Sequence, residues 1–152
     1  MIYSAIGIMS GSSLDGLDIV FADYTEIGGK WTFTIKEAVC HPYDADWQTR
    51  LCNARTLNAY DYQLLHTQFG HYIGKKINAF IEANHLFHKV HLVASHGHTT
   101  FHEPAFGFTS QLGDGAAIAA ETGLPVVSDL RAVDVALGGQ GAPIVPIGEK
   151  FL

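Results

Sequence analysis

The amino-terminal part of the chain alternates between apolar and polar positions in a way that predicts three strands. Residues 3–9 form an apolar run that ends in the small polar segment 10–13, which is typical of a buried strand entering a tight loop. Residues 17–24 are rich in strand-forming side chains, and a glycine pair at 28–29 supplies a turn before the alternating residues 31–36. Short turns between successive strands predict an antiparallel meander.

Helical periodicity follows the meander. Residues 44–55 contain no glycine or proline, and Asp44 can cap a helix at their start. Over residues 58–86, apolar side chains recur at spacings of three and four, so one apolar stripe runs along a long helix that must pack on a sheet. Residues 115–122 predict a further helix, which Gly123 would end.

Two more strands are predicted between and after these helices, over residues 90–95 and 124–128. The expected fold class is therefore α/β, with a mixed sheet and helices packed on it. Polar residues gather at 10–15, 96–100 and 129–134, each time just after a predicted strand. Ligands of open α/β sheets bind beyond the carboxyl ends of strands, so we expect the three clusters to share one cleft.

The composition fits one compact domain without staples. Of the 152 residues, 47% are hydrophobic, and the formal net charge of −6 argues against a nucleic-acid partner. No apolar run is long enough for a membrane span, and the amino terminus lacks the basic region of a signal peptide, which predicts a soluble cytoplasmic protein. Cys40 and Cys52 are expected to be reduced core thiols. A glycine- and proline-rich loop at 138–146 lies close to the last residue, Leu152, so we expect a second part of the protein to be missing.

The first candidate site is the segment Gly11-Ser12-Ser13-Leu14-Asp15-Gly16 between two predicted strands. Small residues let a bent backbone point several N–H groups into one concavity, and serine hydroxyls add donors, which together suit a phosphate. The segment is neither a Walker loop nor a Rossmann fingerprint. An ordinary hairpin turn is the alternative, because glycine and serine are common turn residues.

The second candidate consists of His96, His98 and His102. Imidazole is a common zinc ligand, so a zinc site is one interpretation. Neutral histidine and the neighbouring threonines can instead form a polar wall that hydrogen-bonds a sugar or a carboxylate. Purely structural histidines are the third possibility.

The third candidate joins Asp129, Arg131 and Asp134 to the glycine-rich segment 138–141. The planar guanidinium of Arg131 can pair with a carboxylate through two hydrogen bonds, which favours ligand contact. The alternative is a surface ion pair with one of the two aspartates. The apolar set Phe101, Phe106 and Phe108 is expected to lie in the core.

Taken in order, these motifs resemble the anhydro-N-acetylmuramic acid kinases. The segments that carry the resemblance are GIMSGSSLDGLD at 7–18, SHGHT at 95–99 with HEP at 102–104, DLR at 129–131 with DVA at 134–136, and GGQGAP at 138–143. Family members commonly have Gln where this chain has His98.

The resemblance implies the sugar-kinase and actin-like ATPase superfamily, in which two lobes with ribonuclease-H-like sheets close around ATP and substrate. Residues 1–152 would form the amino-terminal lobe, and the carboxy-terminal lobe would be absent from this chain. The family's catalytic aspartate lies in a motif downstream of the GGQGAP segment. The resemblance therefore implies no catalytic residue in this chain and places the base downstream of Leu152. The full-length protein is expected to be a homodimer.

The activity implied is ATP-dependent phosphorylation of O6 of 1,6-anhydro-N-acetylmuramic acid, while water opens the anhydro bridge. ATP and Mg²⁺ are the implied cofactors, and the product, N-acetylmuramic acid 6-phosphate, belongs to cell-wall recycling. The resemblance assigns the phosphates of ATP to eight consecutive residues, Gly11, Ser12, Ser13, Leu14, Asp15, Gly16, Leu17 and Asp18. It assigns the sugar to Thr99, Arg131, His96, Gln111 and Asp129.

Two rival functions stay open at this point. One is a zinc hydrolase built on His96 and His98, and the other is a non-catalytic actin-like lobe that binds a partner.

Overall fold

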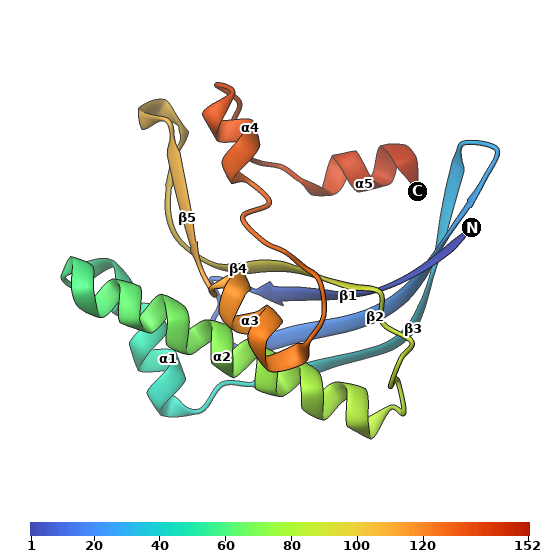
Figure 1. Ribbon diagram of the computed structural model, residues 1–152. Coiled ribbons are helices and arrows are strands. Elements are labelled where there is room, and N and C mark those ends of the chain that lie inside the picture. Colours follow the sequence, from blue (N-terminus) through green and yellow to red (C-terminus); the bar gives the residue numbers. More distant parts are fainter.

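The meander predicted at the amino end is present in the computed structural model, which describes the backbone of residues 1–152 and the side chains of 1–146 and 148–152 (Figure 1). Its strands are β1 (Ile2–Ser10), β2 (Gly16–Ile27) and β3 (Lys30–Pro42), and both pairings are antiparallel. The strand β1 is longer than predicted by one residue at each end, and β2 and β3 are longer because their hairpin continues beyond the buried part of the sheet (Figure 1).

The sheet grows from β1 on the other side. The strand β4 (Leu92–Glu103) lies parallel to β1, while β5 (Phe108–Leu112) and β6 (Val126–Val127) both pair with β4, at its end and its start respectively. The order β3-β2-β1-β4, with a parallel β6 beyond, is that of a ribonuclease-H-like mixed sheet. The predicted fold class is therefore confirmed.

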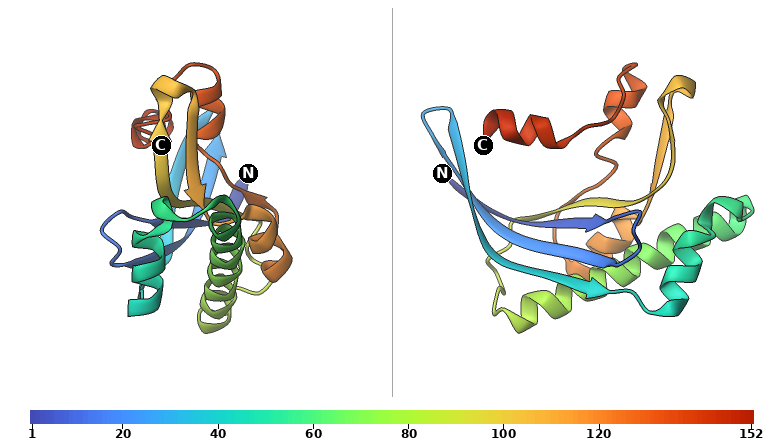
Figure 2. Two further views of the ribbon diagram at one scale, coloured as in Figure 1. Left: turned by 90° about the vertical axis from the view of Figure 1, so that its left-hand side faces the viewer. Right: turned by 180° about the vertical axis from the view of Figure 1, so that it is seen from behind.

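Three helices cover one face of this sheet (Figures 1 and 2). They are α1 (Ala45–Cys52), which is followed by the 3₁₀ turn η1 (Ala54–Thr56), α2 (Ala59–Ala83) and α3 (Gly115–Thr122). The Asp44 carboxylate accepts from Trp47 N–H at 2.8 Å, so Asp44 caps α1 as predicted. Gly123 ends α3 at a φ of 68°, also as predicted.

The core lies between the sheet and α2. The apolar stripe of α2 is buried against the inward-facing side chains of β1, β2 and β4. The almost fully buried members of this core include Ile6, Leu17, Ile19, Phe69, Ile73, Ile77 and Val93. Each such side chain contributes about 1.5–3 kcal/mol when it is fully buried.

Two glycines on α2 let α3 approach closely. A Cβ atom on Gly70 would lie 2.6 Å from the carbonyl oxygen of Asp114, and one on Gly74 would lie 2.5 Å from Cβ of Glu121. These separations are far below van der Waals contact, so only glycine permits the observed packing of α3 on α2. The helix α3 in turn leads directly from β5 to β6.

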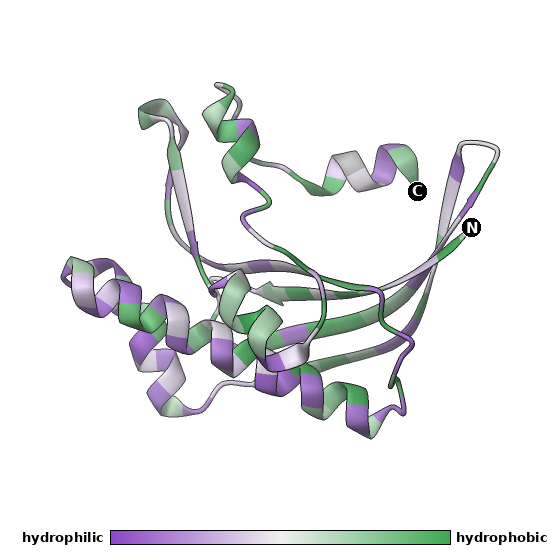
Figure 3. Ribbon diagram, in the orientation of Figure 1, coloured by the Kyte–Doolittle hydropathy of each residue, from purple (hydrophilic) through white to green (hydrophobic). Residues whose placement is uncertain are grey.

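The helix α5 (Val145–Phe151) crosses above the opposite face of the sheet (Figure 2), whose central strands are largely hydrophobic in sequence (Figure 3). A cavity of about 760 Å³ lies between them and is lined by Gly7, Met9 and Ala94 on the sheet and by Val145. This second face is less completely covered than the face that carries α1, α2 and α3.

Four elements were not predicted. The strand expected to end at residue 95 runs on to Glu103 and forms a hairpin with β5 across the 3₁₀ turn η2 (Pro104–Phe106). The polar residues that were expected to follow the strand belong to it, because they pair with β5. The short helix α4 (Ala132–Ala136) also appears, and the loop predicted over residues 138–146 gives way to α5.

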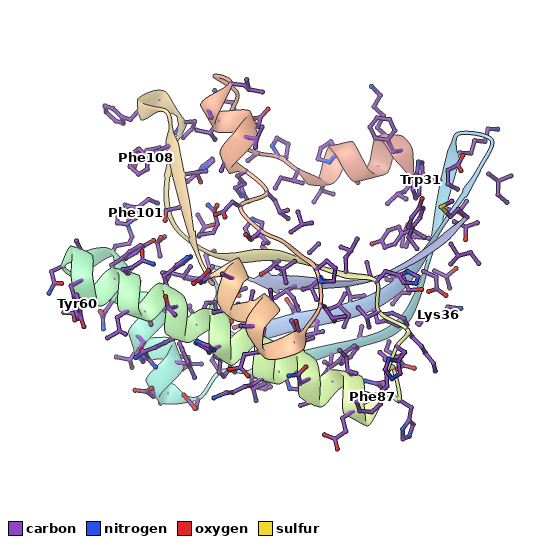
Figure 4. The ribbon with its side chains drawn as sticks, viewed as in Figure 1. Trp31, Lys36, Tyr60, Phe87, Phe101 and Phe108 are labelled. Carbon is purple, nitrogen blue, oxygen red and sulfur yellow. The ribbon has the colours of Figure 1, made fainter. Side chains whose placement is uncertain are left out.

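Two predictions about burial were wrong. Cys40 and Cys52 are free and exposed, because both lie at the margins of their elements and not in the core. The neighbouring Asp18 carboxylate raises the pKa of the Cys40 thiol. Phe106 lies in the turn η2 and is 81% exposed, and Phe108, on the projecting β4–β5 hairpin (Figure 4), is also exposed. None of the helices in the described part of the chain is both long and apolar enough to span a membrane.

Candidate functional site

The loop between β1 and β2 is a tight turn that presents two hydroxyl groups to solvent. The Leu14 N–H donates to the Gly11 carbonyl at 3.3 Å, and Leu14 has a φ of 58°. Ser12, Ser13 and Asp15 are exposed. Ser13 and Asp15 also line a cavity of about 450 Å³ between the loop and α1. The loop thus offers hydroxyl groups and a carboxylate on one open surface.

The rest of the predicted phosphate segment points elsewhere. Gly16 and Leu17 belong to β2, and the Leu17 side chain is wholly buried in the core. Asp18 lies on the other face of the sheet and lines the cavity under α5. Strand alternation explains this separation, because successive residues of β2 face opposite sides of the sheet. Leu17 and Asp18 therefore do not share the surface of the loop hydroxyls.

His96 and Arg131 form a hydrogen-bonded pair between β4 and the start of α4. The Arg131 Nε–H donates to Nε2 of His96 at 2.9 Å, and His96 Nδ1 lies 3.1 Å from the Gly97 carbonyl oxygen. The first contact requires an unprotonated Nε2, so we assign the proton of the neutral ring to Nδ1, which donates to Gly97. Burial lowers the pKa of His96, and the Arg131 charge adds to the effect.

Arg131 keeps part of its donor capacity. Its second hydrogen bond runs from one terminal nitrogen to the Gly141 carbonyl oxygen at 3.2 Å. A guanidinium has five N–H donors, so three remain for a ligand after these two bonds. Among the described side chains, Arg131 takes part in no ion pair, and the surface ion pair considered from the sequence is not formed.

The two neighbouring aspartates have different surroundings. Asp134 accepts from the Gly141 N–H at 2.6 Å, and its carbonyl accepts from the Gly139 N–H at 2.8 Å. Asp134 therefore folds the glycine-rich segment onto α4. Asp129 is exposed, has a φ of 54° and accepts from the Ser128 hydroxyl at 3.1 Å.

Thr99 and Gln111 face each other across the β4–β5 hairpin. Gln111 is buried and donates through Nε2 to the Thr109 hydroxyl at 2.7 Å, which in turn donates to the Phe101 carbonyl at 3.3 Å. Thr99 is half-buried. The hairpin therefore supplies a polar wall whose side chains are held by one another.

The three histidines of the second candidate site go to three different partners. His96 bonds to Arg131, His98 Nδ1 lies 3.1 Å from the Ser10 hydroxyl oxygen, and His102 Nδ1 lies 3.1 Å from that of Thr109. Within the part of the chain that the structure describes, no group of three or more His, Cys, Asp or Glu side chains is arranged to hold a metal ion. The zinc interpretation gains no support from this geometry.

The three polar clusters are linked to one another by hydrogen bonds, whereas the single cleft expected from the sequence stays a prediction. The parallel pairing of β1 with β4 places Ser10 opposite His98, which joins the first cluster to the second. The bond between His96 and Arg131 joins the second cluster to the third. Sequence reasoning missed Tyr43, whose hydroxyl donates to Ser10 Oγ at 2.8 Å, because nothing in the local pattern around it signals a contact at long range.

The carboxy-terminal residue lies apart from these clusters. Leu152 directly follows α5, its backbone N–H donates to the Gly148 carbonyl at 2.8 Å, and it is exposed. The structure describes nothing downstream of Leu152, so the catalytic base that the family resemblance places there stays a prediction.

The fold is expected to be less stable in acid because of three histidines. Burial lowers the pKa of His41, His96 and His98 from the ordinary value. Groups of this kind bind fewer protons in the folded state than in the unfolded state. The free energy of unfolding is therefore highest above the unfolded pKa of about 6.5 and falls as the pH drops toward the lower folded pKa values, by at most about 1.4 kcal/mol per pH unit for each group.

Urea unfolding of the 152-residue chain at about pH 8 and about pH 5.5 would measure this loss. The matched variant His98→Gln removes one of the three titrating groups, so its stability should depend less steeply on pH. An unchanged pH slope in the variant would contradict a buried neutral His98.

The sheet order and the small-residue loop after the first strand define a class of protein. A mixed α/β sheet of this order is consistent with the amino-terminal lobe of an actin-like ATPase-type kinase. The chain matches the family model of anhydro-N-acetylmuramic acid kinase over residues 3–152. It therefore belongs to the anhydro-N-acetylmuramic acid kinase family.

Curated relatives named anhydro-N-acetylmuramic acid kinase support this membership. The chain is 37% identical to the protein of Sulfurovum sp. (strain NBC37-1), with 97% of the chain and 41% of the relative covered. It is 40% identical to the protein of Acinetobacter baylyi, with 93% and 37% covered, and 36% identical to that of Paramagnetospirillum magneticum, with 97% and 41% covered. The chain thus spans about two fifths of the length of these relatives.

Proposed function

We propose that the full-length protein phosphorylates O6 of 1,6-anhydro-N-acetylmuramic acid with ATP and opens the anhydro bridge with water. The observation that carries this proposal is the family match along residues 3–152, in a chain whose three polar clusters are linked by hydrogen bonds. The chain would be the amino-terminal lobe of a two-lobe, cytoplasmic, homodimeric enzyme of cell-wall recycling.

The proposed reaction makes and breaks two bonds. The oxygen of water bonds to the anomeric carbon as the bond from that carbon to O6 breaks, and a carboxylate base takes the proton of water. O6 then bonds to the γ-phosphorus, and the bond between the γ-phosphorus and the oxygen that bridges it to the β-phosphorus breaks, which releases ADP. By family resemblance the base lies downstream of Leu152, so no aspartate of the three polar clusters is assigned to that role. The aspartates concerned are Asp15, Asp18, Asp129 and Asp134.

On this proposal the loop holds the nucleotide. The backbone N–H groups of Gly11, Ser12 and Ser13 and the two serine hydroxyls would donate to phosphate oxygens. Mg²⁺ prefers oxygen ligands and usually keeps several waters, which suits the exposed Asp15 carboxylate beside Ser13. When bound there, the ion would neutralise charge on the transferring phosphoryl group.

The sugar would lie against β4, β5 and α4. Arg131 is our candidate for the lactyl carboxylate, because three of its donors remain available and two bonds fix its plane. The residues that would contact sugar hydroxyls are Thr99, His96, Gln111 and Asp129. The hydrogen bond from Arg131 orients the His96 ring, which favours a fixed wall over an adaptable one.

A product assay tests the proposal. The full-length protein should convert ATP and the anhydrosugar to a product heavier by one water and one phosphoryl group, as measured by mass spectrometry. A product heavier by the phosphoryl group alone, or no product, would overturn the proposal. The 152-residue chain alone should bind ATP weakly and show no turnover, since on this proposal it carries no catalytic base; turnover by this chain would refute the split of the site between two lobes.

A further inference from the structure

Beneath the candidate site lies a buried chain of polar side chains that the proposed chemistry does not use. The Tyr43 hydroxyl donates to Ser10 Oγ at 2.8 Å, and Ser10 Oγ lies 3.1 Å from His98 Nδ1. Ser10 is 1% exposed, Tyr43 5% and His98 6%. Burying three polar groups costs free energy unless each has a partner, and here each has one. A satisfied buried network of this kind rigidifies its surroundings.

The network brackets the Gly11–Asp15 loop at both ends. Ser10 is the last residue of β1 and directly precedes the loop. At the far end, the backbone N–H of Tyr43 donates to the Asp15 carbonyl at 3.2 Å. Tyr43, which directly follows β3, therefore holds the start of the loop through its side chain and the end of the loop through its backbone.

The loop itself has little internal support. Its turn closes through the 3.3 Å bond from Leu14 N–H to Gly11, and the Gln48 side chain donates to the Leu14 carbonyl at 3.4 Å. Both distances are at the long end for hydrogen bonds. The conformation of the loop thus depends on what holds its two ends, where the bonds of Tyr43 are shorter.

The same network ties the loop to the polar wall. His98 directly precedes Thr99 in β4, and the parallel register places His98 opposite Ser10. The ring of Tyr43 is fixed in turn by an aromatic cluster, with centroids 6.2 Å from Phe69 and 6.0 Å from Tyr72. A displacement of the Tyr43 hydroxyl would therefore move the loop relative to β4.

We propose that Tyr43, acting through Ser10 and His98, is a positioning residue that fixes the nucleotide loop against the sugar-binding wall. Tyr43 touches neither substrate in this scheme and acts through the backbone of residues 10–15. The nature of the two ligands rests on the proposed function, whereas the hold of Tyr43 on the loop rests on the geometry alone.

The variant Tyr43→Phe tests this in the full-length protein, because it removes the hydroxyl and keeps the aromatic packing. Loss of one buried hydrogen bond is expected to weaken ATP binding about tenfold in calorimetry, while sugar binding changes less than about twofold. Backbone amides of residues 11–15 should exchange with deuterium about tenfold faster. Because both changes act on one loop, the losses from Tyr43→Phe and Ser12→Ala should be non-additive.

Tyr72→Phe is the matched control, since Tyr72 belongs to the same aromatic cluster and lies outside the Tyr43–Ser10–His98 network. It should leave loop exchange and ATP affinity unchanged. If Tyr43→Phe lowers the melting temperature but leaves both readouts as in wild type, Tyr43 is merely structural and the proposal is overturned. If wild type binds no ATP, the proposed function fails, and the exchange of the loop amides still decides the role of Tyr43.

Discussion

Replacing Arg131 with alanine is expected to lower kcat/KM for 1,6-anhydro-N-acetylmuramic acid about 100-fold in the full-length protein, because a two-bond guanidinium–carboxylate contact is worth roughly 3 kcal/mol. An anhydrosugar without the lactyl group should lose less than about threefold, since its contact with Arg131 is absent from the start. The free donors of Arg131 and its fixed orientation are the basis for this expectation. Steady-state kinetics with the two substrates measure the difference.

Two further observations separate the carboxylate contact from a structural effect of the same change. Arg131 also supports His96 and Gly141, so alanine removes those bonds for both substrates alike. The ratio of the two kinetic losses cancels this shared cost. Arg131→Lys keeps the charge without the planar fork and should fall between wild type and alanine. Equal losses for the two sugars would refute the assignment of Arg131 to the lactyl carboxylate.

The variant Gly16→Ala is expected to destabilise the chain by about 3 kcal/mol, in the range of severe packing clashes. A Cβ atom at this position would lie 2.5 Å from the His41 carbonyl oxygen and 2.8 Å from Cys40 Sγ. The carbonyl belongs to the backbone of β3, so relief requires the β2–β3 ladder to open where Gly16 pairs with Pro42. Urea unfolding of the 152-residue chain measures the loss.

Gly11→Ala is the matched control, because Gly11 begins the loop that Gly16 directly follows. A Cβ atom on Gly11 would lie 3.4 Å from Ser13 Oγ, which is ordinary contact, and the backbone of Gly11 is outside the left-handed region. Its stability should stay within about 0.5 kcal/mol of wild type. If the two variants unfold at the same urea concentration, close packing at Gly16 does not hold the loop.

The sequence predicted those parts of the fold in which the local pattern and the tertiary environment agree. The meander alternates clearly, α2 has a continuous apolar stripe, and α3 ends at the predicted Gly123. The end of β4 was missed because its polar residues are paired by β5, which is a tertiary effect. The helices α4 and α5 were missed because short helices depend on packing more than on propensity.

The candidate site was predictable in outline for a related reason. Polar residues that follow strand ends converge whenever the strands are neighbours, and β1 and β4 are. The family resemblance implies the ligands but not the geometry. It grouped Leu17 and Asp18 with the loop, although strand alternation turns one into the core and the other to the far face of the sheet. The contact between Tyr43 and Ser10 could not be predicted, because it depends on β3 ending beside Ser10 in the folded sheet.

A crystal structure of the full-length protein with Mg²⁺ and a non-hydrolysable ATP analogue would test the nucleotide assignment most directly. We expect phosphate oxygens within about 3 Å of the backbone N–H groups or hydroxyls of Ser12 and Ser13, with the sugar-binding wall of β4 and β5 across the cleft. A nucleotide bound far from this loop would contradict the central claim, whatever the enzyme's activity proved to be.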